Sequence, residues 1–198
     1  MTSDANLKQP AFAPDAAWQG DVRAGVRHVR DLAALPLSPA ERGAAQKAAA
    51  SHKVRVPKAY LDLIDWSDPN DPIRAQVIPS PDELIAAVGE FDDPIGDHAY
   101  SPVPRLTHRH ADRVLLFPTY QCAVYCRFCF RKESLTSIGR GYTREALEPA
   151  LAYIAGHPEI REVILTGGDP LSLPDKALAE IRARIEAIPH VRLLRIHT

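Results

Sequence analysis

The sequence predicts an α/β fold, in which a helical, proline-rich N-terminal region of residues 1–108 precedes a domain of residues 109–198. Short apolar runs at residues 114–117 and 163–166 are typical of strands buried on both faces, and a third strand is expected at residues 191–196. Helical patterns separate these strands. The alternation of strand and helix predicts βαβ units, and hence a parallel sheet or an incomplete barrel.

Helix start signals organise the N-terminal region. Apolar positions at helical spacing predict a helix within residues 16–35. Ser38, Pro39 and Glu41 supply an N-cap, a proline at the first position and a capping-box glutamate, so a helix is expected from there to about Ser51. Residues 80–83 repeat this start signal and predict a further helix through residue 88. Residues 66–72 are expected to form turns, and residues 92–107 to be irregular.

Two helices are predicted between the strands of the second domain. Thr143 opens the first, which Gly156 and Pro158 end, and the second ends at Pro189. No helix follows the third strand, although a parallel sheet needs helices over its faces. We therefore expect a truncated chain that holds the first half of a larger barrel. The alternative is a small three-stranded α/β domain backed by the N-terminal helices.

Composition excludes several classes of protein. The chain has 24 Lys and Arg against 25 Asp and Glu, a net charge of −1, which argues against a basic nucleic-acid-binding face. Apolar residues make up 45% and charged residues 25%, the proportions of a globular protein. No apolar run approaches the roughly 20 residues of a membrane span, and the first residues do not form a signal peptide. We expect a cytoplasmic protein with no nucleic-acid or membrane partner.

The three cysteines are the strongest chemical signal. Cys122, Cys126 and Cys129 follow the first strand at C-x3-C-x2-C spacing, and in parallel α/β folds ligand sites lie beyond the carboxyl ends of the strands. An odd, tightly clustered set of cysteines is a poor disulfide framework but suits zinc or an iron–sulfur cluster. A zinc site would need a fourth ligand, such as His108 or His110. A 4Fe–4S cluster would instead keep one iron free for a small molecule.

This spacing, with the aromatic Phe128 before the third cysteine, resembles the radical S-adenosylmethionine (SAM) superfamily. The resemblance implies the first βα units of a partial (βα)6 radical SAM barrel. It also implies a 4Fe–4S cluster held by Cys122, Cys126 and Cys129, with SAM on the open iron and Phe128 near the adenine. Residues 167–169 resemble the superfamily's Gly-Gly-Glu element, which contacts the SAM amino group. Here Gly167 and Gly168 precede Asp169 instead of Glu.

Three further segments, residues 68–79, 101–113 and 165–171, are similar to lysine 2,3-aminomutases. The resemblance implies an isomerase that moves the 2-amino group of L-lysine to carbon 3, with pyridoxal 5'-phosphate (PLP) as a further cofactor. By the same resemblance Arg109 and Arg113 contact the PLP phosphate, and Arg131 pairs with the substrate carboxylate. The lysine that anchors PLP is expected beyond Thr198, so no aminomutase turnover is expected from these 198 residues alone.

Two alternatives remain at this stage. The same chemistry could act on glutamate or on a lysine side chain of a translation factor. A zinc-binding structural module without catalysis is the other. For the enzyme, the resemblance implies an amino acid substrate, an electron donor such as flavodoxin or ferredoxin, and a homo-oligomeric assembly.

Overall fold

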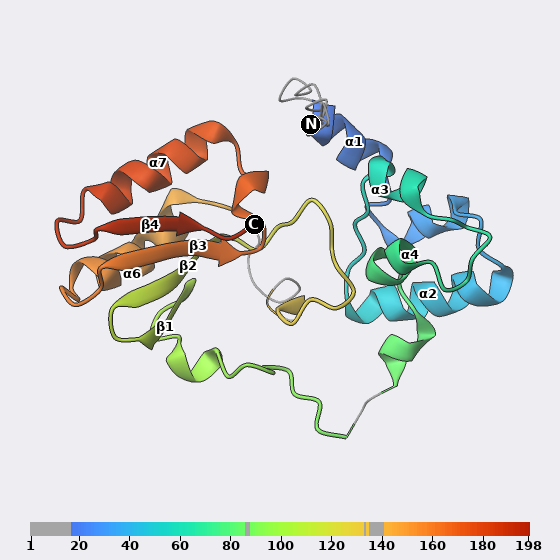
Figure 1. Ribbon diagram of the computed structural model, residues 1–198, viewed down its shortest axis with the longest axis horizontal. Coiled ribbons are helices and arrows are strands. Elements are labelled where there is room, and N and C mark those ends of the chain that lie inside the picture. The colour runs from blue at the N-terminus through green and yellow to red at the C-terminus, as the bar shows by residue number, and fades with distance from the viewer. Residues whose placement is uncertain (1–16, 86–87, 133, 135–140) are drawn as a thin grey trace, which may run out of the picture.

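A four-stranded sheet forms the C-terminal half of the protein (Figure 1). The computed structural model describes residues 17–85, 88–132, 134 and 141–198. The strands lie in chain order, as β1 (Leu106–His110), β2 (Arg113–Thr119), β3 (Glu162–Gly167) and β4 (Leu193–Ile196). β2, β3 and β4 run parallel, which confirms the predicted βαβ units. β1 pairs antiparallel to β2 and was not predicted, since residues 92–107 were expected to be irregular.

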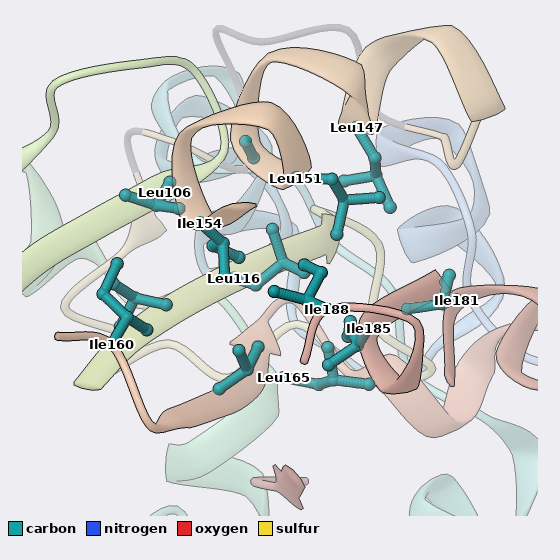
Figure 2. Close-up of a cluster of buried hydrophobic side chains, with 13 residues drawn as sticks. Leu106, Leu116, Leu147, Leu151, Ile154, Ile160, Leu165, Ile181, Ile185 and Ile188 are labelled. Atoms are coloured by element: carbon teal, nitrogen blue, oxygen red, sulfur yellow. The ribbon is translucent and has the colours of Figure 1, made fainter. Parts of the chain in front are cut away.

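Helices α6 (Arg144–Ala155) and α7 (Asp175–Glu186) pack on one face of this sheet. The predicted α6 boundaries are confirmed, because the Thr143 side chain accepts from the Ala146 N–H at 3.1 Å and Gly156 is the C-cap. Alternate strand residues meet these helices in the main core, which Figure 2 shows. Its labelled members are Leu106, Leu116, Leu147, Leu151, Ile154, Ile160, Leu165, Ile181, Ile185 and Ile188.

The N-terminal helices form a separate body with its own core (Figure 1). They are α1 (Ala17–Ala24), α2 (Pro39–Ser51), α3 (Lys58–Leu63), α4 (Pro72–Val77) and the short 3-10 helices η1 (Val29–Ala34) and η2 (Pro81–Leu84). This body lies beside the sheet and does not cover the face opposite α6 and α7. The structure therefore disagrees with the alternative of a three-stranded domain backed by N-terminal helices. No helix in the described part of the chain is long and apolar enough to span a bilayer.

The helix predicted within residues 16–35 is wrong as a single element. The chain leaves α1 at Gly25, and Val26 forms an antiparallel bridge with Val56 through two hydrogen bonds of 2.9 and 2.8 Å. A Cβ on Gly25 would lie 2.0 Å from the Val56 carbonyl oxygen, so only glycine allows the two segments to approach this closely. Tertiary pairing overrides the helical periodicity here.

The prediction at residues 80–88 is correct only at its start. Ser80 caps η2, with Glu83 completing the capping box, but the helix ends at Leu84 and Ile85 is extended. Ile85 is 68% and Val88 108% exposed, so the apolar face meets no core that would stabilise a longer helix. Residues 86–87 lie outside the described residues.

The predicted turn at residues 66–72 ends where α4 begins at Pro72. The sequence analysis predicted neither α3 nor α4.

Candidate functional site

The cysteine loop, residues 120–132, follows β2 and lies between the sheet and the N-terminal body, where Figure 1 draws it in yellow. Val124 packs against the core of the N-terminal body. Cys122 and Cys129 pack instead against the aromatic cluster of Phe117, Tyr120 and Tyr125 beside the sheet. The loop is therefore held from two sides by apolar contacts.

Hydrogen bonds join the same loop to the N-terminal body. The Tyr125 N–H donates to the Arg55 carbonyl at 2.9 Å, and the Arg127 N–H donates to the Gln76 carbonyl at 2.8 Å. In the other direction, Arg55 Nη1 donates to the Cys122 carbonyl at 2.9 Å, and His52 Nε2 lies 3.3 Å from the Cys126 carbonyl. Two of the three cysteines thus have their backbone fixed by side chains of the N-terminal body. Sequence analysis found no such role for this region.

The cysteines are free thiols in partly exposed positions. Burial, together with the neighbouring Cys129 and Asp169, raises the pKa of Cys122 to about 12. Burial and the neighbouring Cys129 also raise the pKa of Cys126. Without a bound cation Cys122 and Cys126 therefore hold their protons, and binding iron would release them.

The donor set fits a cluster. Among the described residues no three His, Cys, Asp or Glu side chains are arranged to hold a single metal ion. A 4Fe–4S cluster does not need such an arrangement, since each thiolate binds a different iron. Three thiols on one short loop, partly exposed and free of disulfides, supply three such ligands. Cys122, Cys126 and Cys129 are the residues that would hold it.

Gly167, Gly168 and Asp169 lie at the carboxyl end of β3, directly against the start of the cysteine loop. Gly167 has φ +106°, a conformation that side-chain-bearing residues rarely adopt. A Cβ on Gly168 would lie 2.4 Å from the Gln121 carbonyl oxygen. The Asp169 N–H donates to that same oxygen at 2.8 Å. The structure thus brings the three residues to the cysteine loop, while their contact with SAM stays a prediction.

Asp169 is already engaged by protein groups. Its Oδ1 accepts from the Leu171 N–H at 3.0 Å and from the Thr198 hydroxyl at 2.6 Å. Phe128 is by contrast 69% exposed, which leaves its ring accessible to a ligand. Its predicted place near the adenine also stays a prediction.

Arg109 and Arg113 line one cavity of about 310 Å³. It lies on the face of the sheet opposite α6 and α7, because Leu115 and Ile164 in its wall alternate with the strand residues of the main core. Four further polar or charged residues line the cavity: Asp97, His110, Arg195 and His197. Arg113 is also bound by its neighbour Asp112, at 2.9 Å between Nε and Oδ1. The lining thus sets three arginines against the one carboxylate of Asp97, while Glu162 pairs with two of the arginines, Arg113 and Arg195.

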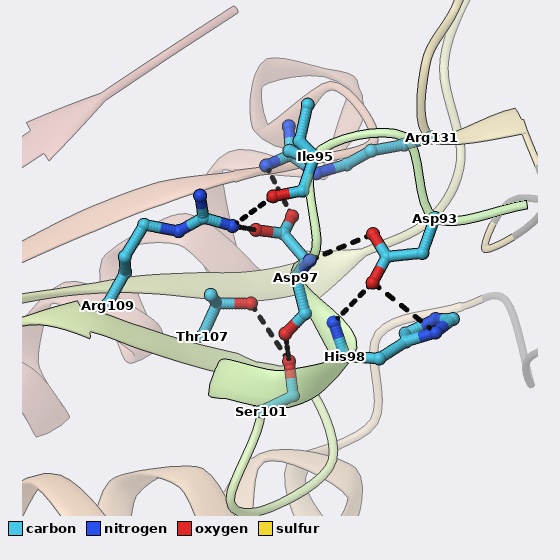
Figure 3. Close-up of polar contacts among 8 residues, drawn as sticks. All are labelled: Asp93, Ile95, Asp97, His98, Ser101, Thr107, Arg109 and Arg131. Atoms are coloured by element: carbon cyan, nitrogen blue, oxygen red, sulfur yellow. Dashed lines mark hydrogen bonds and ion pairs between the residues drawn. The ribbon is translucent and has the colours of Figure 1, made fainter. Parts of the chain in front are cut away.

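Asp97 joins two of the predicted arginines (Figure 3). Its Oδ1 lies 3.1 Å from Arg109 Nη2, and its Oδ2 lies 3.1 Å from Arg131 Nη2. Asp93 holds Asp97 in place by accepting from the Asp97 N–H at 2.8 Å. The structure thus brings Arg109 and Arg131 to one carboxylate, and the described contacts do not include Arg113 in that group. No local sequence pattern indicated Asp97.

The two histidines considered as zinc ligands lie elsewhere. His108 Nδ1 lies 3.0 Å from the Tyr153 hydroxyl, and its ring packs edge-on against Tyr153 of α6. His110 lines the cavity of Arg109 and Arg113. His108 is therefore a hydrogen-bonded structural residue.

Comparison with known proteins decides the family. The family model of the Radical SAM superfamily matches residues 116–198, the part of the chain that contains the cysteine loop and β2 to β4. Residues 116–198 belong to the radical SAM superfamily. Membership implies a 4Fe–4S cluster and SAM as its cofactors.

The most informative relatives of this radical SAM protein are curated enzymes. The chain is 39% identical over 180 residues to the L-lysine 2,3-aminomutase of Clostridium subterminale, covering 90% of this chain and 43% of the relative. It is 41% identical over 145 residues to that of Escherichia coli, covering 73% of this chain and 42% of the relative. It is 40% identical over 139 residues to that of Bacillus subtilis, covering 70% and 30%. The chain spans less than half the length of these curated relatives.

Proposed function

We propose that the chain supplies the cluster-binding part of a PLP-dependent radical SAM aminomutase that moves the 2-amino group of L-lysine to carbon 3. The observation that carries the proposal is the pairing of two sites. A loop of three free thiols, Cys122, Cys126 and Cys129, meets a Gly-Gly-Asp segment at the strand ends. Two arginines next to it, Arg109 and Arg131, share the carboxylate of Asp97. The identity to proteins named L-lysine 2,3-aminomutase supports this substrate.

When bound, the cluster supplies an electron to SAM, and PLP holds the migrating amino group. The electron would come from a donor such as flavodoxin or ferredoxin. The protein's own contribution is to bind and orient these groups. Gly167 and Gly168 let the end of β3 pack against the Phe117 ring and the Gln121 backbone, which keeps the Gly-Gly-Asp segment beside the cysteine loop. Phe128, exposed on the loop, offers a ring for the adenine.

The arginines are assigned by their chemistry. A guanidinium meets phosphate or carboxylate oxygens through two parallel N–H donors. Arg109 and Arg113 open onto the cavity on the sheet face, and we assign them to the PLP phosphate. Arg131 is 15% exposed, with its guanidinium 4.5 Å from the Phe130 ring centroid. We assign Arg131 to the substrate carboxylate, because the ring and Asp97 fix its direction.

Anaerobic reconstitution of the 198-residue chain with iron and sulfide tests the proposal. We expect a brown protein with thiolate-to-iron absorption that, once reduced, cleaves SAM to methionine and 5'-deoxyadenosine. A colourless protein that loads zinc and takes up no iron would refute it in favour of a structural zinc module. We expect no β-lysine from the chain alone, and turnover by it would contradict that part of the proposal.

The substrate has a separate test. The reading frame downstream of Thr198 is expected to encode a lysine for PLP and paired acidic residues that recognise the far ammonium group of lysine. Their absence would favour glutamate or a lysine side chain of a translation factor. Size-exclusion chromatography tests the expected homo-oligomer.

A further inference from the structure

Arg127 lies between two of the cysteines, yet its side chain enters the N-terminal body and is 5% exposed. Its Nε donates to Glu83 Oε1 at 2.9 Å, and its Nη2 pairs with the other oxygen of Glu83. Its Nη1 donates to the Lys53 carbonyl at 2.9 Å and to the His52 carbonyl at 3.2 Å. A single guanidinium thus joins the cysteine loop to two segments distant in sequence.

Both segments are themselves fixed. Glu83 is the capping-box residue of η2, where its Oε1 accepts from the Ser80 N–H at 2.9 Å. Burial alone raises the pKa of Glu83, but the hydrogen bonds from Arg127 and Ser80 outweigh it and keep this pKa below its ordinary value. The carbonyls of His52 and Lys53 lie at the C-terminal end of α2, where the helix dipole attracts a cation.

Arg127 is also adjacent to a predicted cluster ligand. Its own N–H is held by the Gln76 carbonyl, and the carbonyl of Cys126 lies 3.3 Å from His52 Nε2. Movement of the Arg127 side chain would therefore move the backbone that carries Cys126. Groups one step removed from the metal commonly orient its ligands in this way.

We propose that Arg127 is a positioning residue for the iron–sulfur cluster, and that the N-terminal body is through it a structural part of the cluster site. This inference rests on the proposed function, since it requires that the cysteines bind a cluster. Arg127 fixes the conformation of the loop whose Cys126 would bind iron, and Glu83 fixes Arg127. When the contacts between Arg127 and Glu83 are lost, the cysteine loop can move, and iron should then leave the cluster more easily.

The test compares reconstituted wild-type protein with Arg127→Gln, Arg127→Lys, Glu83→Gln and Arg42→Gln. The measurement is the rate of iron release to a chelator under anaerobic conditions, together with the electron paramagnetic resonance spectrum of the reduced cluster with and without SAM. Arg42→Gln is the matched control. Arg42 donates to the carbonyls of Leu35 and Leu37 within the N-terminal body and makes no described contact with the loop.

We expect Arg127→Gln to release iron about tenfold faster or more. Arg127→Lys and Glu83→Gln should be intermediate, since an ammonium cannot form the paired contacts of a guanidinium. Arg42→Gln should match the wild type even where its thermal midpoint falls. Arg127→Gln should also lose or shift the spectral change caused by SAM, which a merely structural residue would leave intact. If Arg127→Gln fails to fold, the same comparison is made with Glu83→Gln and Arg127→Lys.

The outcomes separate the two ideas. Wild-type release rates and spectra in the Arg127 and Glu83 variants, with a stable wild-type cluster, overturn the inference alone. An equally fast release of iron from Arg42→Gln also overturns the inference, because the effect then comes from a general loss of protein stability. A wild-type protein that takes up no iron overturns the inference and the proposed function together.

Discussion

Replacing Gly168 by alanine tests whether the Gly-Gly-Asp segment and the cysteine loop are packed as tightly as the structure indicates. A Cβ at Gly168 would lie 2.4 Å from the carbonyl oxygen and 2.7 Å from the nitrogen of Gln121, whereas ordinary contact begins at 3.4 Å. Both neighbours are backbone atoms, which cannot move aside as a side chain can. The strand end and the loop must therefore separate by about 1 Å, the difference between these contact distances.

The size of the effect follows from what that separation breaks. Overpacking typically costs about 1–3 kcal/mol. Two hydrogen bonds span the gap, from the Gly168 N–H to the Thr119 carbonyl at 2.9 Å and from the Asp169 N–H to the Gln121 carbonyl at 2.8 Å. Each contributes about 1 kcal/mol when intact. We expect Gly168→Ala to lower the free energy of unfolding by about 3–5 kcal/mol when both bonds are lost.

Denaturant unfolding followed by circular dichroism measures this loss, and iron content after reconstitution shows whether the loop still binds a cluster. Gly43→Ala is the control. Gly43 lies inside α2, and a Cβ there would meet no atom within 4 Å, so alanine should stabilise the protein by up to about 1 kcal/mol. A Gly168→Ala protein as stable as wild type, with full iron uptake, would refute the close approach on which the assignment of this segment depends.

Three further predictions concern other parts of the chain. Cys126→Ala should abolish reductive SAM cleavage, assayed as 5'-deoxyadenosine, because two thiolates do not hold the cluster; retained cleavage counts against the cysteine assignment. Hydrogen bonds from Ser38 and Arg74 lower the pKa of Glu41 from its ordinary value of 4.5 to about 2. Because the pKa of Glu41 is lower in the folded than in the unfolded state, this stabilisation is present above about pH 4.5 and is lost as the pH falls toward 2. Glu41→Gln should remove that part of the acid dependence when the free energy of unfolding is measured from pH 2 to 6. An unchanged pH profile would contradict this prediction. Asp97→Asn should lower the free energy of unfolding by about 1–2 kcal/mol, because it leaves the partly buried Arg131 without its carboxylate. Denaturant titration measures this loss. A titration that shows no loss would mean that the ion pairs of Figure 3 do not contribute to stability.

The sequence predicted the elements whose formation depends on neighbouring residues. The buried runs of β2 and β3 and the caps of α6 are local patterns, and the structure confirms them. β1 was missed because its burial changes along its length, from buried Leu106 and Thr107 to exposed Arg109 and His110. It is a strand because it pairs with β2, which composition alone does not indicate. The break at Gly25 has the same cause, since it depends on Val56, which lies far along the chain.

The candidate site divides in the same way. A cysteine motif is local, because one short loop must supply all three thiols, so its spacing suffices to recognise it. Glu83 and Asp97 reach the site from 44 and 34 residues before their partners Arg127 and Arg131, and nothing near either acid in sequence indicates which arginine it meets. The capping box at Ser80 and Glu83 was recognised, but as the start of a helix. The same carboxylate caps η2 and holds Arg127, so its local role concealed the distant one.

This division explains how a region without a recognisable motif bears on a motif-defined site. The cysteine loop pairs only some of its own backbone groups, such as the Cys129 N–H with the Cys126 carbonyl at 3.2 Å, and others find partners outside it. Here Asp169, just after β3, supplies a partner at one end of the loop, and the N-terminal body supplies further partners through Arg55, Gln76 and His52. The alignment with the aminomutase of Clostridium subterminale extends over 90% of the chain, well beyond the matched domain of residues 116–198. That extent is what we expect if the N-terminal body is retained for the contacts that fix the cysteine loop as well as for its own stability.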